Sequence, residues 1–204
     1  MRLAILISLA ALLGMGGAAL ADDAAVEGLL KCEVGAHGGY LVPVSYAEAH
    51  RADILATLPD EPEVDAFWKV SEQIAIVADR NLRETLEDAV KDPAMLALLF
   101  PDLTPTSGGD ATQPDSLEYQ HNELKEIVAH YGVYHRQYVG LMIDGHQIVL
   151  LNYSVGPGLD PAEGFICIHR VFQPGMRFLQ CRFNWDYSKV TNVSMYGTWQ
   201  DIKN

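Results

Sequence analysis

The spacing of apolar side chains changes from a helical to a strand period after residue 131, and this change limits the fold more than any other feature. Upstream, apolar residues recur at steps of three and four. Downstream, alternation with a period of two runs through 134–143 and 146–153. Asp144-Gly145 lies between these stretches, and this dipeptide suits the positive φ angles of a type I′ turn. The sequence therefore predicts a β-hairpin over 134–153.

A two-residue turn also fixes the register of this hairpin. Val139 is then opposite Leu150, and Leu141 is opposite Ile148. These aliphatic residues share one face, which we expect to pack on helices. Further strands are predicted at 165–172, 176–185 and 190–199, where short apolar runs are separated by Gly and Pro.

Helices are predicted throughout the first part of the chain. Ser45 and Glu48 form a capping box for a helix that ends near Thr57. A long helix is expected over 62–91, a short one over 94–100, and another from Ser116 to Tyr131. Residues 22–44 have the composition of a loop, with a short helix near 24–31.

Helices followed by an antiparallel meander of four to five strands give an α+β fold class. We expect the N-terminal amphipathic helices to pack on one face of this meander. The hydrophobic content of 49% supports one domain over 22–204. Residues 101–116 have the composition of a flexible loop inside it.

The first 21 residues resemble a cleavable signal peptide. Arg2 precedes a short apolar run that ends in Ala19-Leu20-Ala21. A retained membrane anchor is the alternative, but three glycines interrupt the run and Asp22 follows at once. The expected product is exported to the periplasm or the extracellular space, without stable membrane insertion after cleavage.

The chain is acidic, with 27 Asp and Glu against 14 Lys and Arg and a net charge of −13. Most of the acids precede residue 131. Such a surface disfavours nucleic acid and anionic lipid as partners. A protein or a small ligand remains as the expected partner.

Three cysteines are expected in an oxidising compartment. Cys167 and Cys181 flank Gln173-Pro174-Gly175, and a loop centred on Pro174 would place them opposite each other at disulfide distance. A two-residue Pro174-Gly175 loop would instead put them on opposite faces. Two further arrangements stay open, in which Cys32 pairs with one of these cysteines or all three thiols are free and buried.

No catalytic or metal-binding motif is present in the sequence. His121, His130 and His135 are close together but do not form His-Glu-x-x-His, and Gly-x-Ser-x-Gly is missing. No cofactor and no metal are therefore predicted. A hydrolase that uses scattered histidines, His169 included, with carboxylates is the alternative function.

The second face of the predicted hairpin combines tyrosines with arginine, a composition typical of recognition surfaces. We expect a binding site on this open face, with Arg170 and Arg182 joining it from the next strands. Its residues are Tyr134, Arg136, Tyr138, Tyr153, Arg170 and Arg182. In the alternative, Arg136 stacks on tyrosines and pairs with an acid from the acidic part of the chain.

The stretch Tyr134-His135-Arg136-Gln137-Tyr138-Val139-Gly140, followed by Asp144-Gly145 and an apolar strand, resembles a pattern in uncharacterised small bacterial exported proteins and lipoproteins. The resemblance implies a similar domain outline and no particular activity. Together with the missing catalytic motifs, the hairpin face predicts a non-catalytic binding or interaction module of the cell envelope.

Overall fold

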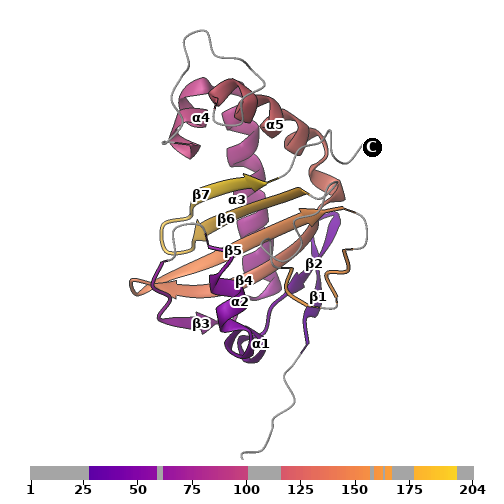
Figure 1. Cartoon of the computed structure of the whole chain (residues 1–204), viewed down its shortest axis with the longest axis vertical. Coiled ribbons are helices and arrows are strands. Elements are labelled where there is room, and N and C mark those ends of the chain that lie inside the picture. Colours follow the sequence, from indigo (N-terminus) through magenta and orange to yellow (C-terminus); the bar gives the residue numbers. More distant parts are fainter. Residues whose placement is uncertain are drawn as a thin grey trace, which may run out of the picture.

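A mostly antiparallel sheet forms the centre of the computed structural model, which describes residues 28–58, 62–100, 116–156, 159–162, 164–166 and 177–196. Seven strands lie in this described part, in the order β1-β2-β4-β5-β6-β7 with β3 beside β4 (Figure 1). They are β1 (Leu30–Val34), β2 (His37–Leu41), β3 (Ala66–Trp68), β4 (His135–Ile143), β5 (His146–Val155), β6 (Arg177–Asn184) and β7 (Lys189–Tyr196). The α+β class predicted from the sequence is confirmed.

The helices surround this sheet. They are α1 (Val44–Ala49), α2 (Arg51–Leu55), α3 (Glu72–Lys91), α4 (Pro93–Leu99) and α5 (Leu117–Ala129), followed by the 3-10 helix η1 (Tyr131–Val133). No helix of the described part has both the length and the apolar character needed to cross a bilayer.

The predicted hairpin is confirmed in position and register. Val139 pairs with Leu150 and Leu141 with Ile148. Asp144 and Gly145 have φ angles of 51° and 75°, as a type I′ turn requires. The strands expected at 176–185 and 190–199 correspond to β6 and β7.

Two parts of the strand prediction are wrong. The sequence predicts a strand over 165–172 between β5 and β6, but β5 and β6 pair directly with each other. Residues 165 and 166 are not in a strand, and 167–172 lie outside the described residues. The expected loop over 22–44 contains the β1–β2 hairpin, whose turn begins at Gly35 with φ of 62°. Consecutive glycines in β2 hide its period-two pattern.

Two helix starts also differ from the prediction. The long helix begins at Glu72 rather than at Pro62, and the Ser71 side chain caps it by accepting from the Ile74 N–H. Residues 66–68 pair with β4 as β3 instead. Ser45 lies inside α1, whose N-cap is Pro43, so the Ser45 capping box is wrong. The Ser116 cap of α5 is confirmed by the bond from the Tyr119 N–H.

Apolar residues cover both faces of the central strands. On one face, Ala78, Leu82 and Leu86 of α3 form a buried cluster with Tyr138 and Leu151. On the other face, α1 and α2 contribute to a second cluster that includes Val139, Leu141 and Leu150. Figure 1 shows α3 behind the sheet and the α1–α2 pair in front of it. The arrangement with helices on one face only is therefore not confirmed, and both faces of β4 are covered.

The contact between β3 and β4 depends on Gly140. A Cβ atom at this position would lie 2.2 Å from the Trp68 carbonyl oxygen, a backbone atom. Gly140→Ala must therefore push β3 away and weaken the bonds from the Trp68 indole to the Leu141 and Ile148 carbonyls. We expect the free energy of unfolding to fall by about 2–3 kcal/mol in urea titrations.

Gly38→Ala is the matched control for this substitution. An alanine methyl at Gly38 meets nothing within 4 Å, and the φ angle there is not in the left-handed region. Its effect should stay within about 0.5 kcal/mol of zero. Equal stability of the two variants would show that β3 does not lie against Gly140.

Candidate functional site

The tyrosine and arginine face of the hairpin is buried, which contradicts the predicted open recognition surface. Tyr134, Arg136, Tyr138 and Tyr153 are at most 2% exposed. The reason is that α3 packs over this face. Arg182 pairs with Leu150 and therefore lies on the opposite face, also buried. Arg170 lies outside the described residues.

The alternative interpretation of Arg136 is confirmed. Its Nε donates to Asp79 Oδ1 of α3 at 3.1 Å. Its Nη1 and Nη2 donate to the carbonyl oxygens of Tyr134 and Tyr131, at 2.8 and 2.7 Å. The guanidinium carbon lies 5.0 Å from the ring centre of Tyr131 and 5.2 Å from that of Tyr153. Ion pairing and cation–π contact thus fix the arginine.

Asp79 is the centre of a buried polar cluster. Three tyrosine hydroxyls donate to the same Oδ1 atom, from Tyr131 and Tyr138 at 3.3 Å and from Tyr153 at 2.5 Å. Burial, reinforced by nearby negative charge, raises the pKa of all three phenols well above the ordinary value. They therefore remain protonated donors. We call these three tyrosines, Asp79 and Arg136 the Asp79 cluster.

A second buried ion pair attaches α5 to the sheet. Arg177 of β6 has a fully buried side chain and donates to the Glu123 carboxylate of α5. Burial lowers the pKa of Arg177, and the nearby Tyr134 and Glu123 oppose this effect. This pair joins α5 to β6. It shares no residue with the Asp79 cluster.

A pocket of about 360 Å³ opens beside the Asp79 cluster. Parallel pairing of β2 with β4 is limited to Tyr40–Gln137 and Leu41–Tyr138, and the pocket lies just before these pairs. Its lining comes from β1, β2, η1 and the start of β4. The residues are Lys31, Ala36, His37, Gly38, Gly39, Tyr40, Gly132, Val133, Tyr134, His135 and Arg136. We call it the β2–β4 pocket.

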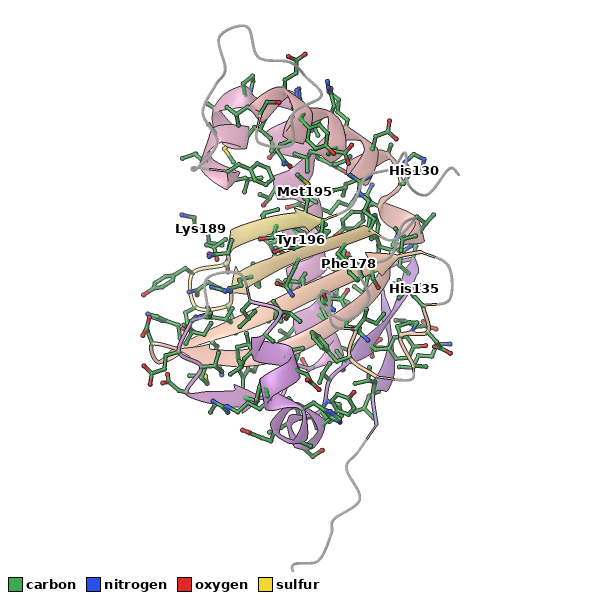
Figure 2. All side chains as sticks on the ribbon, in the orientation of Figure 1. His130, His135, Phe178, Lys189, Met195 and Tyr196 are labelled. Atoms are coloured by element: carbon green, nitrogen blue, oxygen red, sulfur yellow. The ribbon has the colours of Figure 1, made fainter. Side chains whose placement is uncertain are left out.

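The strand register places several lining residues on one face of the sheet. Lys31 pairs with Tyr40, and Tyr40 pairs with Gln137. Because side chains alternate along a strand, Gly38 and His135 share the face of Lys31 and Tyr40. Gly38 has no side chain and therefore leaves this face open between them. Figure 2 shows His135 at the start of β4, on the side of the molecule where β2 lies.

The imidazole of His37 forms another wall of the pocket, against η1. A Cβ atom at Gly132 would lie 3.0 Å from His37 Cε1, so the ring sits directly over this glycine. Burial lowers the pKa of His37, and the charges of Arg136 and Arg83 lower it further, whereas Asp79 opposes them. Positive charge therefore outweighs negative charge around the ring.

Two of the histidines considered for a hydrolase site contact backbone carbonyl oxygens of helices. His121 Nε2 lies 2.8 Å from the Val90 carbonyl, and His130 Nδ1 lies 3.0 Å from the Glu126 carbonyl. His169 lies outside the described residues. Within the described ranges, no three His, Cys, Asp or Glu side chains are grouped so that they could hold a metal ion.

The cross-strand basis for a Cys167–Cys181 disulfide is wrong. Cys181 lies in β6, which pairs with β5 on one side and β7 on the other, and not with the strand that the prediction placed before it. Cys181 and Cys32 are buried free thiols, and Cys167 lies outside the described residues. Burial, followed by the charge of Glu72, raises the pKa of Cys32 to about 11. Both thiols belong to the core that α3 covers.

Sequence reasoning found only part of this site. It singled out Tyr134, Arg136 and His135, but it missed Lys31 and His37. The signal for these residues was the alternation of side chains in the two strands around Gly38-Gly39. It places Lys31 and Tyr40 beside Gly38, which has no side chain. Comparisons with protein-family models, with curated proteins and with solved structures give no match for this chain. The resemblance to small exported bacterial proteins stays a prediction.

Proposed function

We propose that this protein is an exported, non-catalytic binding module of the cell envelope that holds a small ligand in the β2–β4 pocket. The observation that carries the proposal is the pocket itself, a recess of about 360 Å³ with a preformed wall. This volume falls near the lower end of the range for small-molecule sites, about 300–1,000 Å³.

The Asp79 cluster supports binding because it holds one wall of the pocket in place. The Arg136 guanidinium is fixed by Asp79 and by the carbonyls of Tyr131, the first residue of η1, and Tyr134, the residue that follows η1. A wall fixed before the ligand arrives reduces the ordering cost of binding. The cluster therefore serves the pocket as a support rather than as an exposed contact surface.

The lining chemistry favours binding over catalysis. Among the described lining residues, no serine, cysteine or carboxylate stands beside His37 or His135. Nucleophilic catalysis needs such a pair, and general acid–base catalysis usually needs a second group in the same cleft. Backbone, imidazole, ammonium and phenol groups are suited to holding a polar ligand.

Export is tested on the full chain expressed in a bacterium. We expect the product in the periplasm or the medium, with its N-terminus at Asp22, as peptide mass spectrometry would detect. A cytoplasmic product that retains residues 1–21 would contradict the exported part of the proposal and leave the pocket untouched.

Ligand binding is tested by NMR on ¹⁵N-labelled protein mixed with the low-molecular-mass fraction of a bacterial periplasmic extract. Gly38, Gly39 and Gly132 line the pocket. Their amide signals should move, whereas the signal of Gly145, at the distant β4–β5 turn, should not. Equal shifts at Gly145, or no shift at the three pocket glycines, would contradict the proposal.

Two glycine variants make this test specific to the pocket. Gly38→Leu should fill the recess and abolish the shifts. Gly28→Leu is the matched control, because Gly28 also has open space around it and no positive φ, yet it does not line the pocket. Loss of the shifts in both variants would point to a general disturbance of the N-terminal strands and contradict pocket binding.

A further inference from the structure

We infer that the ligand of the β2–β4 pocket is a short peptide, held in the plane of the sheet by backbone hydrogen bonds to Gly38 and Arg136. The inference rests on the proposed binding function and names the class of its ligand. The observation that carries it is an interrupted strand ladder. The pairing of β2 with β4 stops at Tyr40–Gln137, and the recess opens just before this pair.

The backbone N–H and C=O of Gly38, an exposed residue, point towards β4. The β1–β2 turn has two residues, so its closing pair, Val34–His37, is a hydrogen-bonded pair. Gly38 comes next, and its backbone groups therefore point away from β1. The Val42 N–H, four residues further and on the same side of the chain, donates to the Tyr138 carbonyl of β4 at 3.0 Å. The Gly38 groups thus face β4 as well.

The backbone N–H of Arg136 points at the recess from the opposite side. Because Tyr138 offers its carbonyl to the β2 segment, the alternation along β4 turns the Arg136 N–H to the same side. In a continued parallel ladder this N–H would donate to the Gly38 carbonyl. Within the described residues the ladder ends before that bond. Both backbone groups of Gly38 and the N–H of Arg136 are therefore left for a ligand.

The gap between the strands is built into the fold. The Arg136 guanidinium donates to the carbonyl oxygens of Tyr131 and Tyr134, and these bonds fix η1 as the segment before β4. The chain therefore does not continue as a strand beside the start of β2. The His37 ring lies over Gly132 of η1 on one side of the gap. A gap that exists before the ligand arrives lowers the ordering cost of binding.

The side chains around the recess do not select a charged ligand. Lys31 and Glu33 lie on one face of β1, and their opposite charges oppose each other. His37 lies on the other face, where burial, assisted by the charge of Arg136, lowers its pKa, so the imidazole is uncharged at neutral pH. The Arg136 guanidinium is already bound to Asp79 and two carbonyl oxygens. An uncharged ligand with both a donor and an acceptor therefore fits best.

One residue of an extended peptide matches these backbone groups. Its C=O would accept from the Gly38 N–H and its N–H would donate to the Gly38 carbonyl, as in a hydrogen-bonded strand pair. A neighbouring carbonyl of the peptide is then left for the Arg136 N–H. Consecutive glycines in β2, Gly38 and Gly39, leave room for a second backbone to approach closely. The volume of about 360 Å³ limits the ligand to a short peptide.

The first test compares two uncharged probes by NMR. One is N-acetyl-alanyl-alanine N-methylamide. The other is its lactic acid counterpart, in which an oxygen replaces each N–H, so that the shape is kept and the donors are lost. We expect the peptide to shift the amide signals of Gly38, Gly39 and Gly132, and the ester to bind about fivefold more weakly. Rising salt should not change the affinity for the peptide, because no ion pair forms.

Hydrogen exchange identifies the bonded group. When peptide fills about nine-tenths of the pockets, exchange of the Gly38 amide should slow about tenfold, because only the free protein exchanges it. The Gly145 amide donates to Asp65 at the distant β4–β5 turn and should exchange at the same rate with and without peptide. Unchanged exchange at Gly38, or equal slowing at Gly145, would overturn the inference.

Gly38→Pro removes the N–H from the recess without breaking a bond of the β1–β2 ladder, and should weaken peptide binding by about tenfold. Gly39 and Gly132 serve as the readout. Gly38→Ala is the matched control, because it keeps the N–H and its methyl meets nothing within 4 Å. It should bind within about twofold of the wild type. Equal binding by the two variants would overturn the inference, and the wild-type probes decide if the proline variant does not fold.

The remaining outcomes separate this inference from the proposed function. If the periplasmic fraction shifts the pocket glycines but the peptide fails, or the ester binds equally well, the peptide inference is wrong and the binding function stands. If neither the fraction nor the peptide shifts these signals, both are wrong.

Discussion

Asp79→Ala should lower the free energy of unfolding by about 3–5 kcal/mol, the cost of leaving a buried charge without its partner. Arg136 is 1% exposed, and Asp79 is its only carboxylate partner among the described residues. The substitution also removes the acceptor of three buried tyrosine hydroxyls. Urea titrations followed by far-ultraviolet circular dichroism measure the loss.

Two further variants test whether the effect comes from the buried charge. Asp88→Ala removes another aspartate of the same helix, one that is exposed and only weakly paired with Lys91 at 3.5 Å. It should cost less than about 1 kcal/mol. The double variant Asp79→Ala/Arg136→Met removes both charges and should be more stable than Asp79→Ala alone. If Asp79→Ala behaves like Asp88→Ala, the cluster is not buried as described.

The second large effect is a steep loss of stability at alkaline pH. Burial first, and neighbouring charge second, raise the pKa values of Tyr131, Tyr138 and Tyr153 well above 10 in the folded state. In the unfolded chain these phenols titrate near pH 10. Below that pH both states hold the protons, and the stabilising effect is fully present. Above it only the unfolded state releases them, so stability falls as pH rises.

The slope of this loss has a defined size. Each phenol that stays protonated while its unfolded counterpart ionises contributes about 1.4 kcal/mol per pH unit, so the three contribute about 4 kcal/mol per unit. Tyr134, whose pKa burial also raises, adds to this slope. Unfolding free energies measured at several pH values above 10 give the slope directly.

Tyr153→Phe removes one of the titrating groups from the cluster. The variant should be less stable at neutral pH, because Asp79 loses its shortest hydroxyl bond. Its alkaline slope should also be shallower by about 1.4 kcal/mol per pH unit. Tyrosinate absorbance that rises fully before the protein unfolds would contradict the prediction, because it would mean that these phenols ionise in the folded state.

Patterns that depend on neighbours in the chain predicted structure well. Asp144-Gly145 and the alternation on either side of it predicted the β4–β5 hairpin with the observed register, since a two-residue turn leaves no other pairing. The Ser116 cap predicted the start of α5 for the same reason, because the bond to the Tyr119 N–H spans only three residues.

Patterns that depend on distant partners predicted less. Phe67 and Trp68 lie within the stretch 62–91 that was predicted as a helix, yet they form β3. The reason is that β4 offers a free edge there and the Trp68 indole donates to two β-strand carbonyls. The face of Tyr138 and Tyr153 looked open, yet α3 covers it. The acid that pairs with Arg136 on this face is Asp79 of α3, one of many acids in the first part of the chain.

The sequence by itself determined the α+β class, the β4–β5 hairpin and the presence of a tyrosine–arginine face, because turn geometry and side-chain period are local properties. Only the tertiary structure decided which face is covered, since that depends on α3 bringing Asp79 to Arg136. It also decided where the β2–β4 pocket lies. The β2–β4 pocket forms between strands about a hundred residues apart in the chain, and no local pattern specifies that meeting.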